Sequence, residues 1–237
     1  MSMAFRNTDL LEVMRTTFSC RDFTDDPVSD GQLHRILDAA RFAPSGGNRQ
    51  GAHVVVVRDR AVRQQLGELC GPTMRLYAAQ GAAGETPFNS VVQSTVDVDD
   101  ALLAEGSAES STPMGARDLF ERLGEVPVVL VVTVDLSVVA SMDKDLDRVG
   151  VVTGASVYPL VWNILLAART EGLAGVVTTA VVPAEDEVGS LLGLPEHHAV
   201  AAMVPLGVPV RPLTRLSRVE VEAFTTIDRY DGPPLTA

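Results

Sequence analysis

Apolar residues recur at helical spacing twice within the first forty positions. Asp9 and Glu12 have the spacing of a reciprocal helix cap, and Ser29 and Gln32 repeat it. The apolar residues that follow each cap keep a helical period: Leu10, Leu11, Val13 and Met14, then Leu33, Ile36, Leu37 and Ala40. The pattern therefore predicts two helices, one on each side of residues 15–28.

Short runs of β-branched and other apolar residues predict strands. His53–Val57 lies between a glycine loop and Arg58-Asp59, and its continuous valines indicate a strand buried on both faces. The other predicted strands are Val126–Val134, Gly175–Val182 and Ala199–Leu206, and further helices are predicted at Arg60–Gln80, Gly150–Thr170 and Pro183–Leu192, the last ended by Gly193. Because nothing forces a domain boundary, we expect residues 1–237 to form a single domain.

Two segments stand apart from this pattern. Residues 81–113 are small and acidic with little period, which is typical of a disordered segment or a functional lid, and we expect a lid insertion. Residues 208–237 contain four prolines and few periodic apolar positions. We expect them to form an extended arm that lies on another surface.

The predicted helix Gly150–Thr170 is apolar almost all the way round. Such a helix has to be enclosed by protein, and in a chain of 237 residues this favours a central helix shared with a second subunit. A helix buried in the core of a monomer fits the same pattern. The sequence thus favours a homodimer without requiring one.

Charge and composition exclude several classes of function. The formal charge is 19 − 31 = −12, which disfavours sequence-independent nucleic-acid binding and attraction to an anionic membrane. The four histidines lack the spacing of a zinc site, so we expect no metal. We expect Cys20 and Cys70 to be buried free thiols, with a disulfide between them as the alternative. With no secretory pattern and no long uninterrupted apolar run, the expected location is the cytoplasm.

The segment Ala43–Gln50 is a candidate ligand loop. Its two adjacent glycines let the backbone come close to a flat or phosphorylated group, while Ser45, Asn48 and Gln50 supply donors and acceptors without bulk. A helix C-cap followed by a turn into a strand explains the same residues.

Basic residues are outnumbered by acidic ones, 19 against 31, and five arginines gather in two places. They are Arg15 and Arg21 on either side of residues 16–20, and Arg211, Arg215 and Arg218 in the predicted arm. The forked guanidinium group suits phosphate, and Ser19 and Ser217 supply hydroxyl groups nearby. Ordinary surface ion pairs with the many carboxylates are the alternative for any single arginine.

Four motifs follow one another along the chain: Ser19-Cys20-Arg21-Asp22-Phe23, Ala43-Pro44-Ser45-Gly46-Gly47-Asn48, Gly172-Leu173-Ala174-Gly175 with Thr178-Thr179, and Pro205-Leu206-Gly207-Val208-Pro209. In this order they resemble motifs of the nitroreductase family of FMN-dependent oxidoreductases: the opening Arg-Ser-x-Arg-x-Phe signature, the flavin loop, the Gly-Leu-Gly strand entry and the late Leu-Gly-x-Pro element. The resemblance covers nearly the whole chain apart from residues 81–113.

The resemblance implies an α+β fold with a central, mainly antiparallel sheet of four strands flanked by helices, and a C-terminal arm that adds a strand to the partner subunit. It implies a homodimer with two FMN sites at the subunit interface. The residues that it assigns to FMN are Arg15, Ser19, Arg21, Pro44, Ser45, Gly46, Gly47, Asn48, Thr178, Thr179, Arg215 and Arg218. Among these, Arg21 would face the pyrimidine edge of the flavin, and Thr178 and Thr179 would supply backbone donors near flavin N5. Arg215 and Arg218 would bind the phosphate from the arm.

The chain departs from the family pattern at two places. Phe18 stands where the family usually has an arginine before the serine, which puts FMN affinity in doubt. Gly51-Ala52 replaces a frequent Pro-Trp and opens space beside the flavin. Arg49, just before it, is a candidate for binding the extra phosphate of NADPH.

The activity that the resemblance implies is that of an NAD(P)H-dependent nitroreductase. NADPH or NADH passes a hydride to FMN and leaves, and a nitroaromatic or quinone acceptor takes its place, in a ping-pong cycle that needs no catalytic side chain. The missing arginine at Phe18 keeps a non-catalytic FMN-binding or storage protein open. A cofactor-free interaction module, with residues 81–113 as its recognition segment, is a further alternative.

Overall fold

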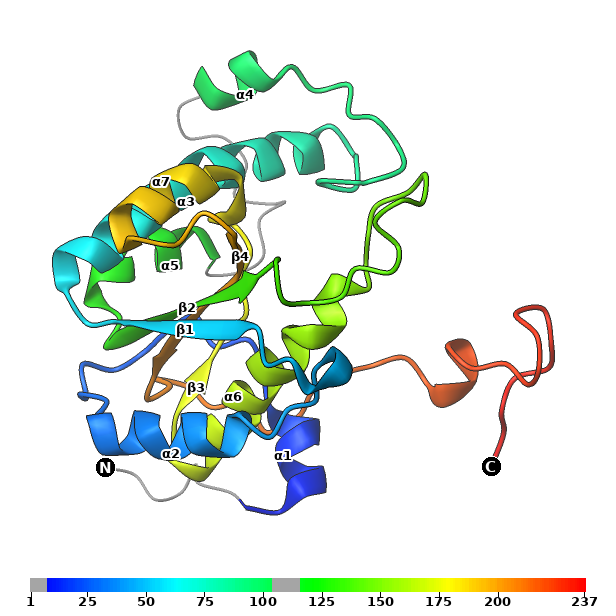
Figure 1. Ribbon diagram of the computed structural model, residues 1–237, viewed down its shortest axis with the longest axis horizontal. Coiled ribbons are helices and arrows are strands. Elements are labelled where there is room, and N and C mark those ends of the chain that lie inside the picture. Colours follow the sequence, from blue (N-terminus) through cyan, green and yellow to red (C-terminus); the bar gives the residue numbers. More distant parts are fainter. Residues whose placement is uncertain (1–7, 104–115) are drawn as a thin grey trace.

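The computed structural model describes residues 8–103 and 116–237, and a four-stranded sheet forms its middle layer (Figure 1). The strands are β1 (Ala52–Val57), β2 (Val128–Asp135), β3 (Ala174–Gly175) and β4 (His198–Gly207), in the order β1-β2-β4-β3. All three pairings are antiparallel. The α+β fold with a central antiparallel sheet is confirmed, and the strand added to a partner stays a prediction.

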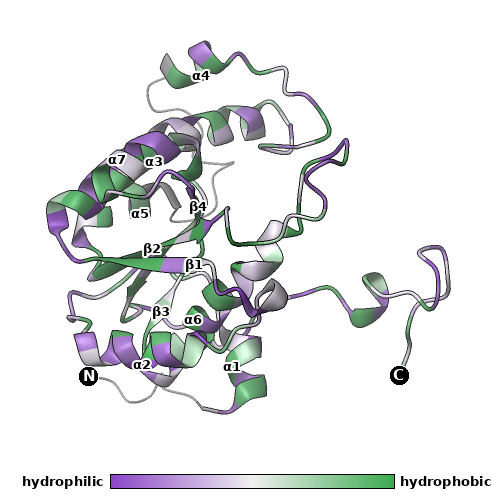
Figure 2. Cartoon of the chain, in the orientation of Figure 1, coloured by the Kyte–Doolittle hydropathy of each residue, from purple (hydrophilic) through white to green (hydrophobic). Residues whose placement is uncertain are grey.

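Helices cover both faces of the sheet (Figure 1). On one face lie α1 (Leu10–Thr16), α2 (Asp30–Ala40) and α6 (Tyr158–Thr170), and on the other α3 (Arg60–Ala82), α5 (Ala116–Glu121) and α7 (Glu185–Leu192), with α4 (Val98–Leu103) packed beside α3. Alternate residues of β2 enter the two cores: Val128 and Leu130 pack towards α2 and α6, and Val129 and Val131 towards α3. Figure 2 shows the resulting hydrophobic centre of the sheet.

The predicted reciprocal cap forms at the second helix, and the first helix is capped through the Asp9 side chain. The Asp9 carboxylate accepts a bond from the Glu12 N–H at 2.8 Å, and Ser29 and Gln32 form a complete capping box at the start of α2. At the end of α7, Gly193 adopts the left-handed conformation (φ 67°) that stops a helix.

The prediction that the first strand is buried on both faces is wrong. β1 is an edge strand, in which His53 and Val56 are exposed. An edge strand has a neighbour on one side only, so the helices that cover the sheet do not shield all of its residues. A run of valines fits a central strand and an edge strand equally well, and pairing alone decides between them.

The predicted strand Gly175–Val182 is wrong beyond its first residue. β3 ends at Gly175, and a single bridge between Thr178 and Met203 continues its register along β4. In that register Val176 lies opposite Pro205, which has no N–H to donate. The ladder is therefore interrupted, and residues 176–180 run outside the regular sheet.

The predicted helix Gly150–Thr170 begins later than expected. Thr153–Ser156 forms a 3₁₀ turn and α6 starts at Tyr158, with Pro159 in its first turn, where a missing N–H is tolerated. Trp162 remains 42 % exposed on α6. A second subunit that would cover this face stays a prediction.

The predicted lid and arm are seen in part. Residues 81–103 contain turns followed by α4, contrary to the expected lack of helical structure, while residues 104–113 lie outside the described residues. The arm extends away from the body with one 3₁₀ turn at Val221–Ala223 and no regular strand in the described chain (Figure 1). Val219 and Phe224 are 69 % and 68 % exposed. The roles of both segments stay predictions.

The described part of the chain also bears on membrane association. No helix within residues 8–103 and 116–237 combines the length and the apolar character needed to cross a membrane.

Candidate functional site

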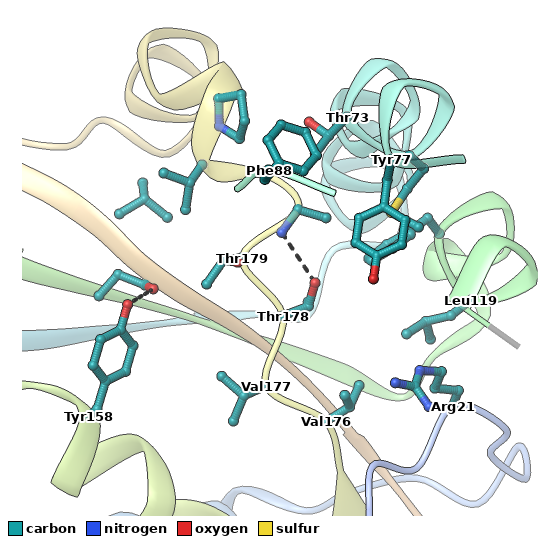
Figure 3. A pocket seen from close by; sticks show the side chains of 17 residues that line it. Arg21, Thr73, Tyr77, Phe88, Leu119, Tyr158, Val176, Val177, Thr178 and Thr179 are labelled. Atoms are coloured by element: carbon teal, nitrogen blue, oxygen red, sulfur yellow. Dashed lines mark hydrogen bonds between the residues drawn. The ribbon is translucent and has the colours of Figure 1, made fainter. Parts of the chain in front are cut away.

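A cavity of about 620 Å³ opens between residues 176–180, α3 and α5 (Figure 3). Its volume lies within the range of small-molecule sites, roughly 300–1,000 Å³. Most of the described side chains around it are apolar or aromatic, and Arg21 is the one cation among those described. The cavity is therefore suited to an apolar ligand with one polar or anionic edge.

Glycines position the floor of the cavity, which residues 176–180 form. Gly172 follows α6 with φ 76°, which turns the chain towards the sheet. A Cβ at Gly175 would lie 2.5 Å from the Pro205 carbonyl oxygen and 2.6 Å from Leu206 Cδ2. Only glycine fits this close approach, which holds the start of the floor against β4.

The two threonines of the floor differ in what they offer a ligand. Thr178 exchanges both backbone hydrogen bonds with Met203, and its Oγ1 accepts the Ala180 N–H at 3.2 Å (Figure 3). Among the described residues, the Thr179 N–H has no acceptor. Of the two donors predicted near a flavin ring, Thr179 is therefore the available one, and the Thr178 N–H is already occupied.

Backbone bonds on both sides of Arg21 fix its position. The Cys20 N–H donates to the Gly175 carbonyl at 3.0 Å, and the Asp22 carbonyl accepts from the Val210 N–H at 3.1 Å. The end of α1 is bound to α6, because Arg169 Nη1 donates to the Thr16 carbonyl at 2.9 Å. The segment between the first two helices is thus anchored to the sheet before it reaches the cavity.

The Arg21 side chain points towards the cavity beside Val176 and Leu119 (Figure 3). Partial burial lowers the pKa of its guanidinium group. It forms no ion pair with a carboxylate of the described residues, and its one recorded bond is a long contact of 3.5 Å from Nη1 to the Ser19 carbonyl. A desolvated cation without a counter-charge favours an anionic or electron-rich group at this position.

Aromatic residues that the sequence analysis did not single out form much of the wall. Tyr77 of α3, Phe88 and Tyr158 of α6 line the cavity, and the Tyr158 hydroxyl donates to the Ala201 carbonyl at 3.3 Å. No motif contains these residues. For Phe88 one signal was available, because it is an isolated aromatic residue in a segment of small residues.

A second cavity, of about 500 Å³, lies where the arm passes α1. Arg15, Arg215 and Arg218 line it together, and none of them forms an ion pair with a carboxylate of the described residues. Glu12 also lines this cavity and partly offsets their charge. Ser19 lines neither cavity; it is exposed and bridges to Gly175.

The loop Pro44–Asn48 is not brought to either cavity within one chain. The Gly46 N–H donates to Ser156 Oγ at 3.1 Å, and Ser45 Oγ accepts the Gln50 N–H at 3.0 Å. Gly47, Asn48 and Gln50 have φ of 61°, 53° and 51°, an unusual cluster of left-handed conformations. Strain of this kind concentrates at ligand-binding loops, yet here the loop faces outwards.

Arg49 lies with this loop and also lines neither cavity. Its Nη1 donates to the Val138 carbonyl at 3.3 Å, and the side chain is exposed. A role in binding a phosphate of NADPH stays a prediction.

Neither thiol is suited to nucleophilic chemistry. Cys20 and Cys70 are both free and buried, which confirms the expectation. Burial raises the pKa of Cys20 to about 11 and the pKa of Cys70 to about 12, so both are protonated at neutral pH. Within the described residues, no group of three or more His, Cys, Asp or Glu side chains is placed to hold a metal ion.

These features fit a flat ring system with one polar edge. Val176 and Val177 offer an apolar surface, the Thr179 N–H offers one directional donor, and Arg21 offers a positive charge that stabilises electron-rich atoms. The cavity itself contains no evident nucleophile–base pair among its lining residues. Its chemistry therefore depends on a bound group.

This chain resembles known proteins in sequence and in fold. The NADH dehydrogenase of Thermus thermophilus is 30% identical over 200 residues, which cover 81% of this chain and 82% of that protein. A solved structure of NADPH:FMN oxidoreductase from Vibrio harveyi, complexed with NAD+, aligns with a TM-score of 0.64 and 21% identity, over 94% of this chain and 78% of that chain. Oxidized iodotyrosine deiodinase bound to FMN and 3-iodo-L-tyrosine aligns with a TM-score of 0.62 and 22% identity, over 94% and 98%. The nitroreductase family matches residues 14–208, and because this match spans most of the sequence, the chain belongs to the nitroreductase family.

Proposed function

We propose that this chain is an FMN-dependent oxidoreductase that accepts electrons from NADPH or NADH and delivers them to nitroaromatic or quinone acceptors. The observation that carries the proposal is the half-buried Arg21 guanidinium, which points towards an apolar cavity without a carboxylate partner in the described chain. Family membership and relatives such as the FMN reductase [NAD(P)H] of Bacillus subtilis, 30% identical over 114 residues, support it. Bound FMN would supply the two-electron transfer.

The chain's own residues would bind the flavin and orient it. Arg21 would hold the pyrimidine edge of the ring and stabilise negative charge there, and the Thr179 N–H would donate to the ring at its centre. The apolar side chains of Val176 and Val177 would contact the ring face and exclude water. Arg15, Arg215 and Arg218 would bind the phosphate in the second cavity. Donor and acceptor would use one open face in turn, which makes the cycle ping-pong.

A homodimer would bring the remaining predicted residues to the site. The strained loop Pro44–Asn48 faces outwards, Trp162 is exposed on α6, and the arm carries exposed apolar side chains. A second copy that covers these surfaces would place the loop of one subunit at the cavity of the other. The two buried free thiols are compatible with a reducing cytoplasm, which we propose as the location.

The visible spectrum of the purified protein tests the proposal most directly. Protein supplied with FMN should retain a yellow flavin spectrum after gel filtration, and NADPH or NADH should bleach it. A nitroaromatic acceptor should then restore the colour and sustain turnover. A storage protein would bind FMN without acceptor-dependent turnover, and an interaction module would stay colourless.

Arg49 tests the choice of hydride donor. If its guanidinium binds the 2′-phosphate of NADPH, Arg49→Ala should raise the KM for NADPH about tenfold and leave the KM for NADH unchanged. Arg122→Ala is the matched control, since Arg122 is an exposed arginine paired with Glu125 outside both cavities. Equal Michaelis constants in the parent and in Arg49→Ala would contradict this role.

A further inference from the structure

Phe88 has a backbone conformation that bulky residues rarely adopt. Its φ is 53°, in the left-handed region. The side chain is 48 % exposed, so burial of the ring offsets only part of the cost. Glycine or asparagine would form the same turn with less strain. Folding stability alone therefore does not account for a phenylalanine at this position.

A buried side chain holds Phe88 in this conformation. Gln80 is 6 % exposed near the end of α3, and its Oε1 accepts the Phe88 N–H at 2.9 Å. The Gln80 carbonyl also accepts the Glu85 N–H at 3.0 Å. Gln80 therefore fixes the turn after α3 through one hydrogen bond accepted by its side chain and another accepted by its main chain.

Further hydrogen bonds join the residues before Phe88 to the residues that follow it. The Glu85 carboxylate accepts bonds from Ser94 Oγ at 2.6 Å and from the Thr95 N–H at 2.8 Å. Directly after Phe88, Asn89 Oδ1 accepts the Val91 N–H at 2.8 Å. The phenylalanine is therefore presented by an ordered loop that is closed on both sides.

The loop places the Phe88 ring at the cavity. Phe88 and Tyr77 both line it, with ring centroids 6.4 Å apart and planes tilted by 37° (Figure 3). The two rings lie near Thr178 and Thr179, on the side of the cavity remote from Tyr158 (Figure 3). Aromatic faces favour offset or edge contacts with other aromatic rings.

We propose that Phe88 is a specificity-determining residue that selects flat aromatic electron acceptors, and that Gln80 is its positioning residue. The inference rests on the proposed function, because it places the acceptor in the same cavity as the flavin. Phe88 and Tyr77 form an aromatic wall against which the ring of the acceptor packs. Gln80 acts by holding the Phe88 backbone at the angle that presents the ring.

Two ligands of equal charge and similar size test the wall without turnover. Calorimetry on the FMN-loaded protein, with no hydride donor present, would compare benzoate with cyclohexanecarboxylate, which lacks the aromatic ring. Phe88→Leu keeps apolar volume but removes the aromatic face. It should weaken benzoate binding about threefold to tenfold and leave cyclohexanecarboxylate binding unchanged. Val91→Ala, an exposed position of the same loop outside the cavity, is the matched control.

Gln80 variants test the positioning role. Gln80→Leu removes the acceptor of the Phe88 N–H and should reproduce the selective loss of benzoate binding, with unchanged FMN content. Gln80→Glu retains an oxygen acceptor and should restore the parent ratio of the two affinities. A merely structural role of Gln80 would weaken both ligands alike.

The outcomes separate the wall from the proposed function. A parent protein that takes up no FMN contradicts the proposed function. An FMN-loaded Phe88→Leu protein that binds benzoate as tightly as the parent, or that loses both ligands equally, contradicts the aromatic wall and leaves the flavin role standing. The KM of a nitroaromatic acceptor should rise by the same factor as the benzoate dissociation constant.

Discussion

At the scale of single residues, the candidate site depends on a few side chains whose surroundings leave a bonding group unused. Arg21 lacks a carboxylate partner in the described chain, and the Thr179 N–H lacks an acceptor there. Arg21 is partly desolvated, so a ligand that pairs with its guanidinium group gains more than it would from a fully exposed group. Residues with satisfied backbone groups, such as Thr178, offer less.

Arg21, which carries the positive charge of the first cavity, should contribute strongly to flavin binding. Arg21→Met removes a charge-assisted bond worth about 1.5–3 kcal/mol, so FMN should dissociate roughly tenfold to a hundredfold more readily. Arg21→Lys should lose less, because the charge remains. Fluorescence titration with FMN measures both, with Arg122→Met as the control. An unchanged FMN affinity in Arg21→Met would contradict the placement of the flavin ring beside Arg21.

Gly175 should tolerate no side chain. Gly175→Ala places a Cβ 2.5 Å from the Pro205 carbonyl and should lower the free energy of unfolding by about 1–3 kcal/mol through overpacking. Gly189→Ala in α7 meets nothing within 4 Å and should be neutral or stabilise by up to about 1 kcal/mol. Urea denaturation compares the two variants. A neutral Gly175→Ala would mean that β4 and the floor move apart at low cost.

At the scale of elements, hydrogen bonds of side chains shape the segments that regular structure leaves free. The loop that follows α3 is closed by the Glu85 carboxylate and by Gln80, and these bonds place Phe88 at the cavity. The floor at residues 176–180 exists because Pro205 interrupts the ladder between β3 and β4.

The Glu85 clamp should depend on pH. Bonds from Ser94, and then from Thr95, lower the pKa of Glu85 below its ordinary value of 4.5. The ionised Glu85 carboxylate therefore contributes its full stabilisation to the loop above pH 4.5. This contribution is lost as the pH falls through the lowered pKa of the folded state. Hydrogen exchange of residues 84–96, corrected for intrinsic rates, should therefore accelerate at low pH and at neutral pH in Glu85→Gln. Equal protection in Glu85→Gln and in the parent at neutral pH would contradict the clamp.

At the scale of the whole molecule, large apolar side chains are exposed on separate elements. The arm leaves the body, and Phe224 on the arm and Trp162 on α6 are exposed (Figure 1). This supports a partner subunit that covers both.

Removal of residues 211–237 tests this assembly. Light scattering should show a dimer for the full chain and a monomer for the truncated chain, and the emission of Trp162, the single tryptophan, should shift to the red. FMN affinity should also fall, because Arg215 and Arg218 are lost. The double variant Arg215→Met with Arg218→Met should lose affinity but remain dimeric. A truncated chain that stays dimeric would contradict the arm as the dimer contact.

The sequence by itself determined the helices α1, α2, α3 and α7, the cores of β1, β2 and β4 and the residue types of the motifs, because these depend on local periodicity and caps. Asp9, Ser29 and Gly193 act within one or two turns of chain, so their effects can be predicted without a fold. The sequence grouped Arg15 with Arg21 and Arg215 with Arg218, whereas the structure brings Arg15, Arg215 and Arg218 to one cavity.

Only the tertiary structure decided which residues share the site. The edge position of β1 and the interruption opposite Pro205 depend on strand pairing, which valine-rich runs do not encode. Phe88, Tyr77 and Tyr158 meet at one cavity from three separate segments, and the bond from Phe88 to Gln80 depends on how the loop folds back on α3. Local pattern determines what each segment becomes, whereas long-range packing determines which groups are left unsatisfied and therefore able to bind.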